Sequence, residues 1–182
     1  MQLHYKLSVA AVALLVLPSA WACWAEAAQR HGVSPDLLIA IARVESDLNP
    51  LAVNRGHVAT TGTVDIGLMQ INSAHLPRLA RDGITEADLY DPCVNIHVGA
   101  WLLADLMARH GATWDAVGAY NAACVRGRRD DCVRTRSRYA WKIYERLQAE
   151  GRRPDHEPGS RAAAATVRSK AAPVIVGLRV SP

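Results

Sequence analysis

Glu45 is an acidic residue at a position where the surrounding helical pattern favours an apolar side chain. The segment 34–46 predicts a helix with Ser34 as its N-cap and a proline at the first helical position. Ala42, Ile41 and Leu38 lie three, four and seven residues before Glu45, so they share one face of the helix with it. Burial against such neighbours disfavours the charged carboxylate and raises its pKa, which would make Glu45 a proton donor near neutral pH. The alternative is an exposed or ion-paired glutamate near the helix end.

Helical patterns also predominate in the segments that must position Glu45. The other expected helices are 24–31, a long amphipathic helix over 92–111, one capped by Thr113, and a last one over 136–148. Residues 51–66 are rich in Asn, Gly and Thr and predict a loop, and no segment shows a persuasive strand alternation.

Several aromatic residues fall on the apolar stripes of these predicted helices. Tyr139 lies on the stripe of the last helix, and Trp101, Trp114 and Trp141 also lie on such stripes. We expect all four to belong to the core rather than to form platforms on which a ligand stacks.

Both ends of the chain differ in composition from its middle. Residues 1–22 combine Lys6, an apolar run and small residues near position 22, which predicts a signal peptide and a periplasmic location. Cys23 follows directly, so a lipoprotein is an alternative, although Trp21 stands where lipoprotein signals carry a small residue. Residues 151–182 are basic and rich in Pro and Ala and predict a disordered tail, which leaves one folded domain over 23–150.

The net charge excludes one class of partner. The tail carries six basic and two acidic side chains, and this difference equals the formal net charge of +4 of the chain. The predicted domain is therefore close to neutral, whereas a nucleic-acid binder places a basic stripe on its folded domain. No stretch after the signal approaches the roughly 20 apolar residues of a membrane-spanning helix. We expect neither a nucleic-acid partner nor a membrane span after signal removal.

The four cysteines are Cys23, Cys93, Cys124 and Cys132. An even number in an exported protein predicts disulfides, and four cysteines allow three pairings. The short separation of Cys124 and Cys132 favours a local bond, which leaves a second bond between Cys23 and Cys93. A zinc site is the alternative, but the sequence has no C-x-x-C pair and no H-E-x-x-H helix, and its histidines are scattered. We expect no metal and no cofactor.

Three short motifs occur in order along the helical region: Glu45-Ser46-Asp47-Leu48-Asn49-Pro50, Gly67-Leu68-Met69-Gln70-Ile71-Asn72 and Ala119-Tyr120-Asn121. Together they resemble those of the lysozyme-like lytic transglycosylases, which cleave the glycan strands of peptidoglycan, and the resemblance runs over most of residues 23–148. The segment Asp91-Pro92-Cys93 and the Cys23-Trp24 start are similar to the small periplasmic transglycosylases of type III and type IV secretion, conjugation and pilus systems. The resemblance implies a mainly α, lysozyme-like domain with a substrate cleft, and such a machine as partner.

The resemblance also assigns roles to individual residues. Glu45 matches the catalytic acid of the family, and Ser46 matches an adjacent hydroxyl that helps to position substrate or water. Tyr120 matches the tyrosine whose hydroxyl holds the catalytic carboxyl group, and Asn121 matches an amide that lines the site.

The second motif is expected to border the substrate. Gln70, with the backbone around Met69, matches the part of the cleft that contacts the sugar. Gly67 would allow close backbone approach beside the ligand groove. Asn95 is expected to secure a local turn rather than to touch substrate.

Cleavage of a glycosidic bond commonly uses a second carboxylate besides the acid. Asp65 is the most plausible one, because Asp47 points elsewhere on its helix and Asp91 is expected to cap a helix. The resemblance implies that no second carboxylate is needed, since the N-acetyl group of the muramoyl sugar assists departure. Glu45 would then donate a proton and accept one from the 6-hydroxyl of the sugar, which closes a 1,6-anhydro ring. The alternatives are a hydrolytic lysozyme, with Asp65 placing a water, and a wall-binding assembly factor without activity.

Overall fold

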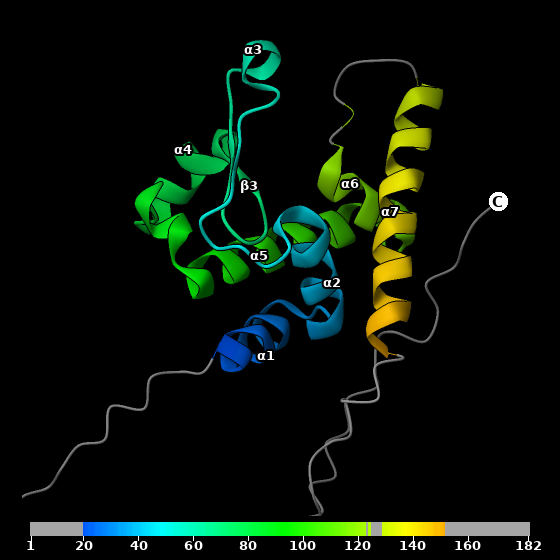
Figure 1. Ribbon diagram of the computed structural model, residues 1–182, viewed down its shortest axis with the longest axis horizontal. Helices are drawn as coiled ribbons and strands as arrows, with labels where there is room; N and C mark the ends of the chain where they lie inside the picture. The colour runs from blue at the N-terminus through cyan, green and yellow to red at the C-terminus, as the bar shows by residue number, and fades with distance from the viewer. Residues whose placement is uncertain (1–19, 123, 125–128, 152–182) are drawn as a thin grey trace, which may run out of the picture.

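A computed structural model describes residues 20–122, 124 and 129–151 of the chain. The described part is mainly helical, as the sequence predicts (Figure 1). Five helices have eight or more residues: α1 (Ala20–His31), α2 (Pro35–Ser46), α5 (Pro92–His110), α6 (Trp114–Asn121) and α7 (Arg129–Gly151). The short helices are α3 (Val58–Thr61) and α4 (Leu76–Leu79), with the 3-10 turns η1 (Ser73–His75), η2 (Ala80–Asp82) and η3 (Ala87–Tyr90). The predicted signal peptide, apart from its last three residues, and the tail after Gly151 lie outside the described residues.

A small antiparallel sheet lies partly within residues 51–66, which were expected to be a loop. Its strands are β1 (Val53–Asn54), β2 (Asp65–Ile66) and β3 (Ile71–Asn72), paired in the order β1-β2-β3. The loop prediction was therefore wrong for β1, α3 and β2, whereas β3 lies outside its range. Strands of two residues are too short to show an alternating pattern, so the sequence carried no strand signal there.

The helix that carries Glu45 is buried on nearly all sides. Every residue from Leu37 to Ala42 is buried, because α2 packs against α1, α5 and α7 and lies between them in Figure 1. Ser34 caps it as predicted, accepting a hydrogen bond from the Leu37 amide at 3.3 Å. The helix ends at Asp47, whose backbone adopts the left-handed conformation with φ of 52°. Glu45 is thus placed one residue before the last helical position of a core helix.

The later helices begin at predicted caps with one exception. Asp91 accepts a hydrogen bond from the Val94 amide at 2.9 Å and starts α5, and Thr113 caps α6. The last helix begins at Arg129 rather than at position 136, so the prediction placed its start too late. The expectation for Trp141 was also wrong, because its side chain is exposed.

Two disulfides are present, one between residues that are distant in the sequence and one between residues that are close. Cys23 of α1 is bonded to Cys93 at the start of α5, with their Cα atoms 5.3 Å apart. Cys124, beyond the end of α6, is bonded to Cys132 in α7, with Cα atoms 5.6 Å apart. Among the residues that the structure describes, no helix has the length and apolar character needed to cross a membrane.

Candidate active site

Glu45 borders a cavity of about 970 Å³ that separate parts of the chain enclose. The sheet region forms one wall, and the helices α5, α6 and α7 supply other parts of the lining. The lining residues that matter for chemistry are Asp65, Gln70, Asn72, Tyr120, Asn121 and Arg136. Predicted site residues from all three sequence motifs therefore meet at one cavity.

The Glu45 carboxyl group has the properties of a proton donor. Burial raises its pKa to about 7, and the negative charge of Asp65 acts in the same direction. A hydrogen bond from Tyr139 and the charge of Lys142 oppose this shift. At neutral pH the group therefore exists as a mixture of acid and carboxylate, so it can both give and take a proton.

Tyr139, and not Tyr120, holds the Glu45 carboxyl group. The Tyr139 hydroxyl donates a hydrogen bond to Glu45 Oε1, whereas the Tyr120 hydroxyl donates to the Met69 carbonyl oxygen at 3.0 Å. The role expected for Tyr120 was therefore wrong. Burial raises the pKa of both tyrosines well above their usual range, and the nearby Glu45 charge raises it further, so both hydroxyls remain protonated donors.

Local sequence patterns carry little sign of this role for Tyr139. It lies on the apolar stripe of α7, where a tyrosine is expected to fill the core, and its side chain is indeed buried. Its partner lies 94 residues earlier in the chain. Only the packing of α7 against α2 brings the two side chains together.

Ser46 has a structural set of contacts. Its hydroxyl donates to the Leu68 carbonyl oxygen at 2.7 Å and accepts from the Asn49 amide at 3.2 Å. These bonds attach the end of α2 to the segment between β2 and β3. They offer no support for the expectation that Ser46 positions substrate or water.

Packing against α5 requires a glycine at position 67. Its φ is 76°, and a Cβ atom there would lie 2.3 Å from Asn95 Nδ2 and 2.5 Å from the Leu89 carbonyl oxygen. Close approach of a ligand to the Gly67 backbone, which the sequence suggested, stays a prediction.

Asn95 connects α5 to the segment that follows β2. Its side chain is buried, and Nδ2 donates to the carbonyl oxygens of Ile66 at 3.0 Å and Leu89 at 2.7 Å. Its Oδ1 accepts a hydrogen bond from the Met69 amide at 2.7 Å. The contact with Leu89 lies in the turn before α5, as expected, whereas the contacts with Ile66 and Met69 join α5 to a distant part of the chain. Met69 is buried with its amide and carbonyl groups both bonded inside the protein, so it supports the site without lining the cavity.

Gln70 lies at the cavity as expected, with a fixed orientation. Its backbone is left-handed with φ of 49°, and Nε2 donates to the carbonyl oxygens of Gly67 at 2.8 Å and Ala52 at 3.2 Å. Asn121 also lines the cavity, at the last position of α6. Contact of these two amides with a sugar stays a prediction.

Asp65 is a second carboxylate at the same cavity. It lies in β2, and its oxygens accept hydrogen bonds from Asn72 Nδ2 at 2.7 Å in β3 and from Asn54 Nδ2 at 3.2 Å in β1. His57 Nε2 lies 3.6 Å from Asp65 Oδ2. The sheet register therefore holds Asp65 between two amides, because Asn54 and Asn72 are its direct cross-strand partners.

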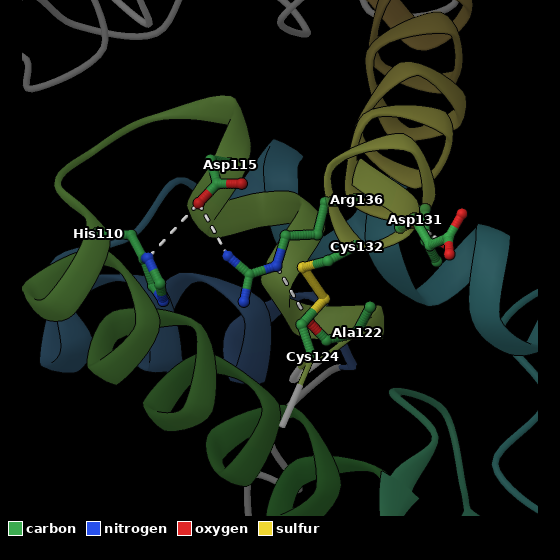
Figure 2. The surroundings of a disulfide bond; sticks show 8 residues. His110, Asp115, Ala122, Cys124, Asp131, Cys132 and Arg136 are labelled. Carbon is green, nitrogen blue, oxygen red and sulfur yellow. Dashed lines mark hydrogen bonds and ion pairs between the residues drawn. A yellow bond between two sulfur atoms is a disulfide. The ribbon is translucent and has the colours of Figure 1, made fainter. Parts of the chain in front are cut away.

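The disulfide between Cys124 and Cys132 lies beside a second link between α6 and α7 (Figure 2). Arg136 of α7 donates to Asp115 Oδ2 at 2.9 Å and to the Ala122 carbonyl oxygen at 3.1 Å. These contacts hold together the two helices that contribute tyrosines to the surroundings of Glu45.

Comparisons with known proteins find a matching family and relatives that cover most of the chain. Residues 22–140 match the sequence model of the family described as Transglycosylase SLT domain. The chain is 43% identical over 145 residues to Invasion protein IagB of Salmonella typhimurium, covering 79% of this chain and 86% of IagB. It is 41% identical over 125 residues to Protein IpgF of Shigella flexneri, covering 68% of this chain and 78% of IpgF.

A solved structure shares the fold. An inactive mutant of lytic transglycosylase Slt from Pseudomonas aeruginosa superposes with a TM-score of 0.56 at 23% identity. The match covers 71% of this chain and 23% of that larger chain.

Proposed function

Because this chain belongs to the transglycosylase SLT domain family and is a peptidoglycan lytic transglycosylase, we propose that Glu45 cleaves the bond between N-acetylmuramic acid and N-acetylglucosamine without water. The product would carry a 1,6-anhydro ring on the muramic acid. The observation that carries this proposal is the buried Glu45 carboxyl group, with a pKa of about 7, at the cavity and in hydrogen-bond contact with Tyr139.

Two proton transfers at Glu45 account for the reaction. In the first, protonated Glu45 gives its proton to the leaving glycosidic oxygen while the N-acetyl group of the muramoyl sugar stabilises the carbon that loses this oxygen. In the second, the Glu45 carboxylate takes the proton of the 6-hydroxyl of the same sugar as that oxygen attacks the carbon. A pKa near 7 suits both steps, because neither form of the carboxyl group is strongly favoured at neutral pH.

Tyr139 orients the acid in this scheme. Its hydroxyl occupies one carboxyl oxygen of Glu45, which leaves the other oxygen for the glycosidic bond. Because burial keeps the pKa of Tyr139 high, this hydroxyl remains a donor throughout and does not compete for the transferred proton.

Hydrolysis is a second candidate that one specific observation favours. Asp65 lies at the same cavity and carries a charge that Glu45 senses. A carboxylate on the other side of the sugar could stabilise the developing positive charge or hold a water. In that case the products would have ordinary reducing ends.

The identity of the released ends tests the proposal. Purified sacculi digested with the wild-type protein should release muropeptides with 1,6-anhydro-muramic acid, which are lighter by one water than the hydrolytic products in a mass spectrum. An Asp65→Asn variant should still form anhydro products. Reducing-end muramic acid as the main product would support the lysozyme alternative.

We propose a periplasmic location and a role in opening the wall locally for an envelope-spanning apparatus. The similarity to Invasion protein IagB and the disulfides support this role. A strain that carries Glu45→Gln at the chromosomal locus should assemble fewer complexes of that apparatus than the wild-type strain. Normal assembly in that strain would show that the cleavage activity serves another purpose.

A further inference from the structure

The outer face of α7 carries exposed aromatic side chains away from the catalytic cavity. Trp141 is 61% exposed and Tyr144 is 37% exposed, and neither lines the cavity that contains Glu45. A tryptophan ring contributes most to stability when its large apolar surface is buried, so this exposure gives the fold little. The sequence predicted that Trp141 belongs to the core, but its side chain faces outward.

The exposed rings are held in place by their neighbours. Trp141 stacks on Tyr144, with ring centroids 5.3 Å apart and planes inclined by 29°. Tyr144 meets Trp114 of α6 edge to face at 5.6 Å, and Trp141 Nε1 donates a hydrogen bond to Glu145 Oε1 at 2.8 Å. We call Trp114, Trp141 and Tyr144 the aromatic platform. Because its rings are already ordered, a ligand that stacks on it loses little side-chain entropy.

A groove of about 460 Å³ lies along the same helix, between α2 and α7. Its lining residues are Arg43, Val44, Lys142, Glu145, Arg146 and Ala149. Of these, Glu145 accepts the hydrogen bond from Trp141 of the aromatic platform. We call this feature the α2–α7 groove. The aromatic platform and the α2–α7 groove are therefore adjacent, because Glu145 contacts Trp141 and also lines the groove.

The α2–α7 groove offers positive charge to a ligand. Arg43 forms an ion pair with Glu150, whereas Lys142 and Arg146 form no ion pair within the described part of the chain. Long cationic side chains of this kind bind carboxylate groups, and arginine can do so through two parallel hydrogen bonds. The groove therefore suits a ligand with carboxylates.

We propose that the aromatic platform and the α2–α7 groove form a second binding site for peptidoglycan, separate from the catalytic cavity. Amino-sugar rings would lie with their C–H faces on Trp141, and carboxylates of the peptide stems would bind Lys142 and Arg146. Peptidoglycan is one polymer that presents both chemistries, apolar sugar faces and regularly spaced carboxylates. The choice of this polymer rests on the proposed function.

The proposed site has a plain use for an enzyme with a polymeric substrate. The catalytic cavity holds a limited length of glycan, while the strand and its crosslinked neighbours extend beyond it. Attachment at α7 would keep the enzyme on the wall between cleavage events, because the second contact raises the effective concentration of substrate. Short soluble strands would gain nothing from it.

Binding to insoluble sacculi tests the proposal without depending on turnover. The full chain with Glu45→Gln is sedimented with purified sacculi, alone and with Trp141→Ala added. We expect Trp141→Ala to weaken binding about tenfold, as for loss of a well-ordered aromatic contact. Val133→Ala is the matched control, because Val133 is a 53% exposed apolar residue of the same helix and should leave binding unchanged. Equal binding of the Trp141→Ala and control variants would overturn the proposal.

Two further comparisons define the ligand. Lys142→Gln with Arg146→Gln should weaken binding to peptide-bearing sacculi but not to insoluble chitin, whose N-acetylglucosamine rings carry no carboxylate. In the otherwise wild-type protein, Trp141→Ala should slow digestion of sacculi and leave cleavage of short soluble strands unchanged.

Each outcome separates the two proposals. A wild-type protein that binds through Trp141 but cleaves nothing would contradict the proposed function and leave the second site in place. Cleavage of sacculi at the same rate with and without Trp141 would contradict the second site alone, and the exposed rings would then serve contact with a protein.

Discussion

At the scale of single residues, burial and the Tyr139 hydrogen bond shift the pKa of Glu45 in opposite directions. Burial favours the protonated acid, and the Tyr139 hydrogen bond favours the carboxylate. Their sum leaves the pKa at about 7, which is the range a group needs when it must first give and then take a proton.

Replacing Glu45 by glutamine should remove activity and increase stability above neutral pH. The folded-state pKa of about 7 lies above the usual 4.5. The contribution of Glu45 to the unfolding free energy is therefore fully present below pH 4.5 and is lost as the pH rises through 7. At pH 8 the Glu45→Gln variant should be more stable than the wild type by about 3 kcal/mol, an order-of-magnitude figure from the pKa shift. Urea unfolding at pH 4 and pH 8 measures this. A variant of equal or lower stability at pH 8 would show that the carboxylate is not penalised by burial.

Replacing Tyr139 by phenylalanine should shift the pH dependence of cleavage upward. The Tyr139 hydroxyl lowers the pKa of Glu45, so its loss should raise that pKa above 7 and move the alkaline limb of the kcat profile to higher pH. We also expect kcat to fall roughly tenfold, since the carboxyl group loses its orientation. The matched control is Tyr120→Phe, which removes a bond to Met69 and should leave the position of the limb unchanged. Equal shifts in both variants would contradict the assignment of Tyr139.

The contrast between these tyrosines shows how far sequence reasoning reaches at this scale. The acid could be predicted, because a charged residue interrupts an apolar helical face. The partner could not, because both tyrosines lie on helices with apolar stripes, and a hydrogen bond over 94 residues has no local pattern. Asp65 could only be noted as a candidate, since the sheet that orients it was not recognised.

At the scale of elements, the site depends on contacts between the sheet region and α5. Asn95 of α5 binds the chain on both sides of Gly67, and Gly67 has the left-handed backbone that this close approach needs. Through Met69, the same contacts support the carbonyl group to which Tyr120 donates. Glycine at this position is therefore part of the framework of the cavity.

Gly67→Ala should be strongly destabilising, and the chain offers a close control. An added Cβ would lie 2.3 Å from Asn95 Nδ2 in a backbone of φ 76°, so we expect a loss of about 3 kcal/mol or more in unfolding free energy. Gly62 has a similar φ of 71° with nothing within 4 Å of the added Cβ, so Gly62→Ala should cost only about 1 kcal/mol. Urea unfolding of both variants gives the comparison. Similar losses would show that backbone strain, and not the contact with Asn95, fixes the glycine.

Elements with capping residues were predictable, and elements without local signals were not. Ser34, Asp91 and Thr113 mark the starts of three helices correctly, because a cap is a local hydrogen bond of its own segment. The strands were missed because they are held by cross-strand contacts of two residues each. The first turns of α7 were missed because they are polar and are attached by Cys132 and Arg136 rather than by an apolar stripe.

At the scale of the whole molecule, two disulfides tie the helical framework at separate places. The bond between Cys23 and Cys93 spans 70 residues and joins α1 to α5. The bond between Cys124 and Cys132 spans 8 residues beside the pair of helices that carries Tyr120 and Tyr139. The first restrains most of the chain around the site, and the second restrains one corner of it.

Removal of each disulfide should therefore have a different effect. The stabilisation by a disulfide increases with the length of the loop that it closes. Loss of the first bond, in Cys23→Ser with Cys93→Ser, should lower the unfolding free energy by about 4 kcal/mol. Loss of the second, in Cys124→Ser with Cys132→Ser, should lower it by about 2.5 kcal/mol. The second pair lies beside α6 and α7, which carry Tyr120 and Tyr139, so its loss should lower kcat more at a temperature where both variants are folded. Thermal unfolding and kcat on sacculi test the two parts. An identical kcat in both double variants would show that the second bond does not position the site.

The origin of the oxygen at the new glycan end distinguishes attack by the sugar from attack by water. Sacculi are digested in heavy-oxygen water, and the released fragments are weighed by mass spectrometry. Attack by the 6-hydroxyl of the muramoyl sugar, with Glu45 as acid and then base, predicts anhydro ends that contain no label, and no release by the Glu45→Gln variant. Labelled reducing ends in the wild-type digest would contradict this account and show that water, not the sugar, completes the reaction.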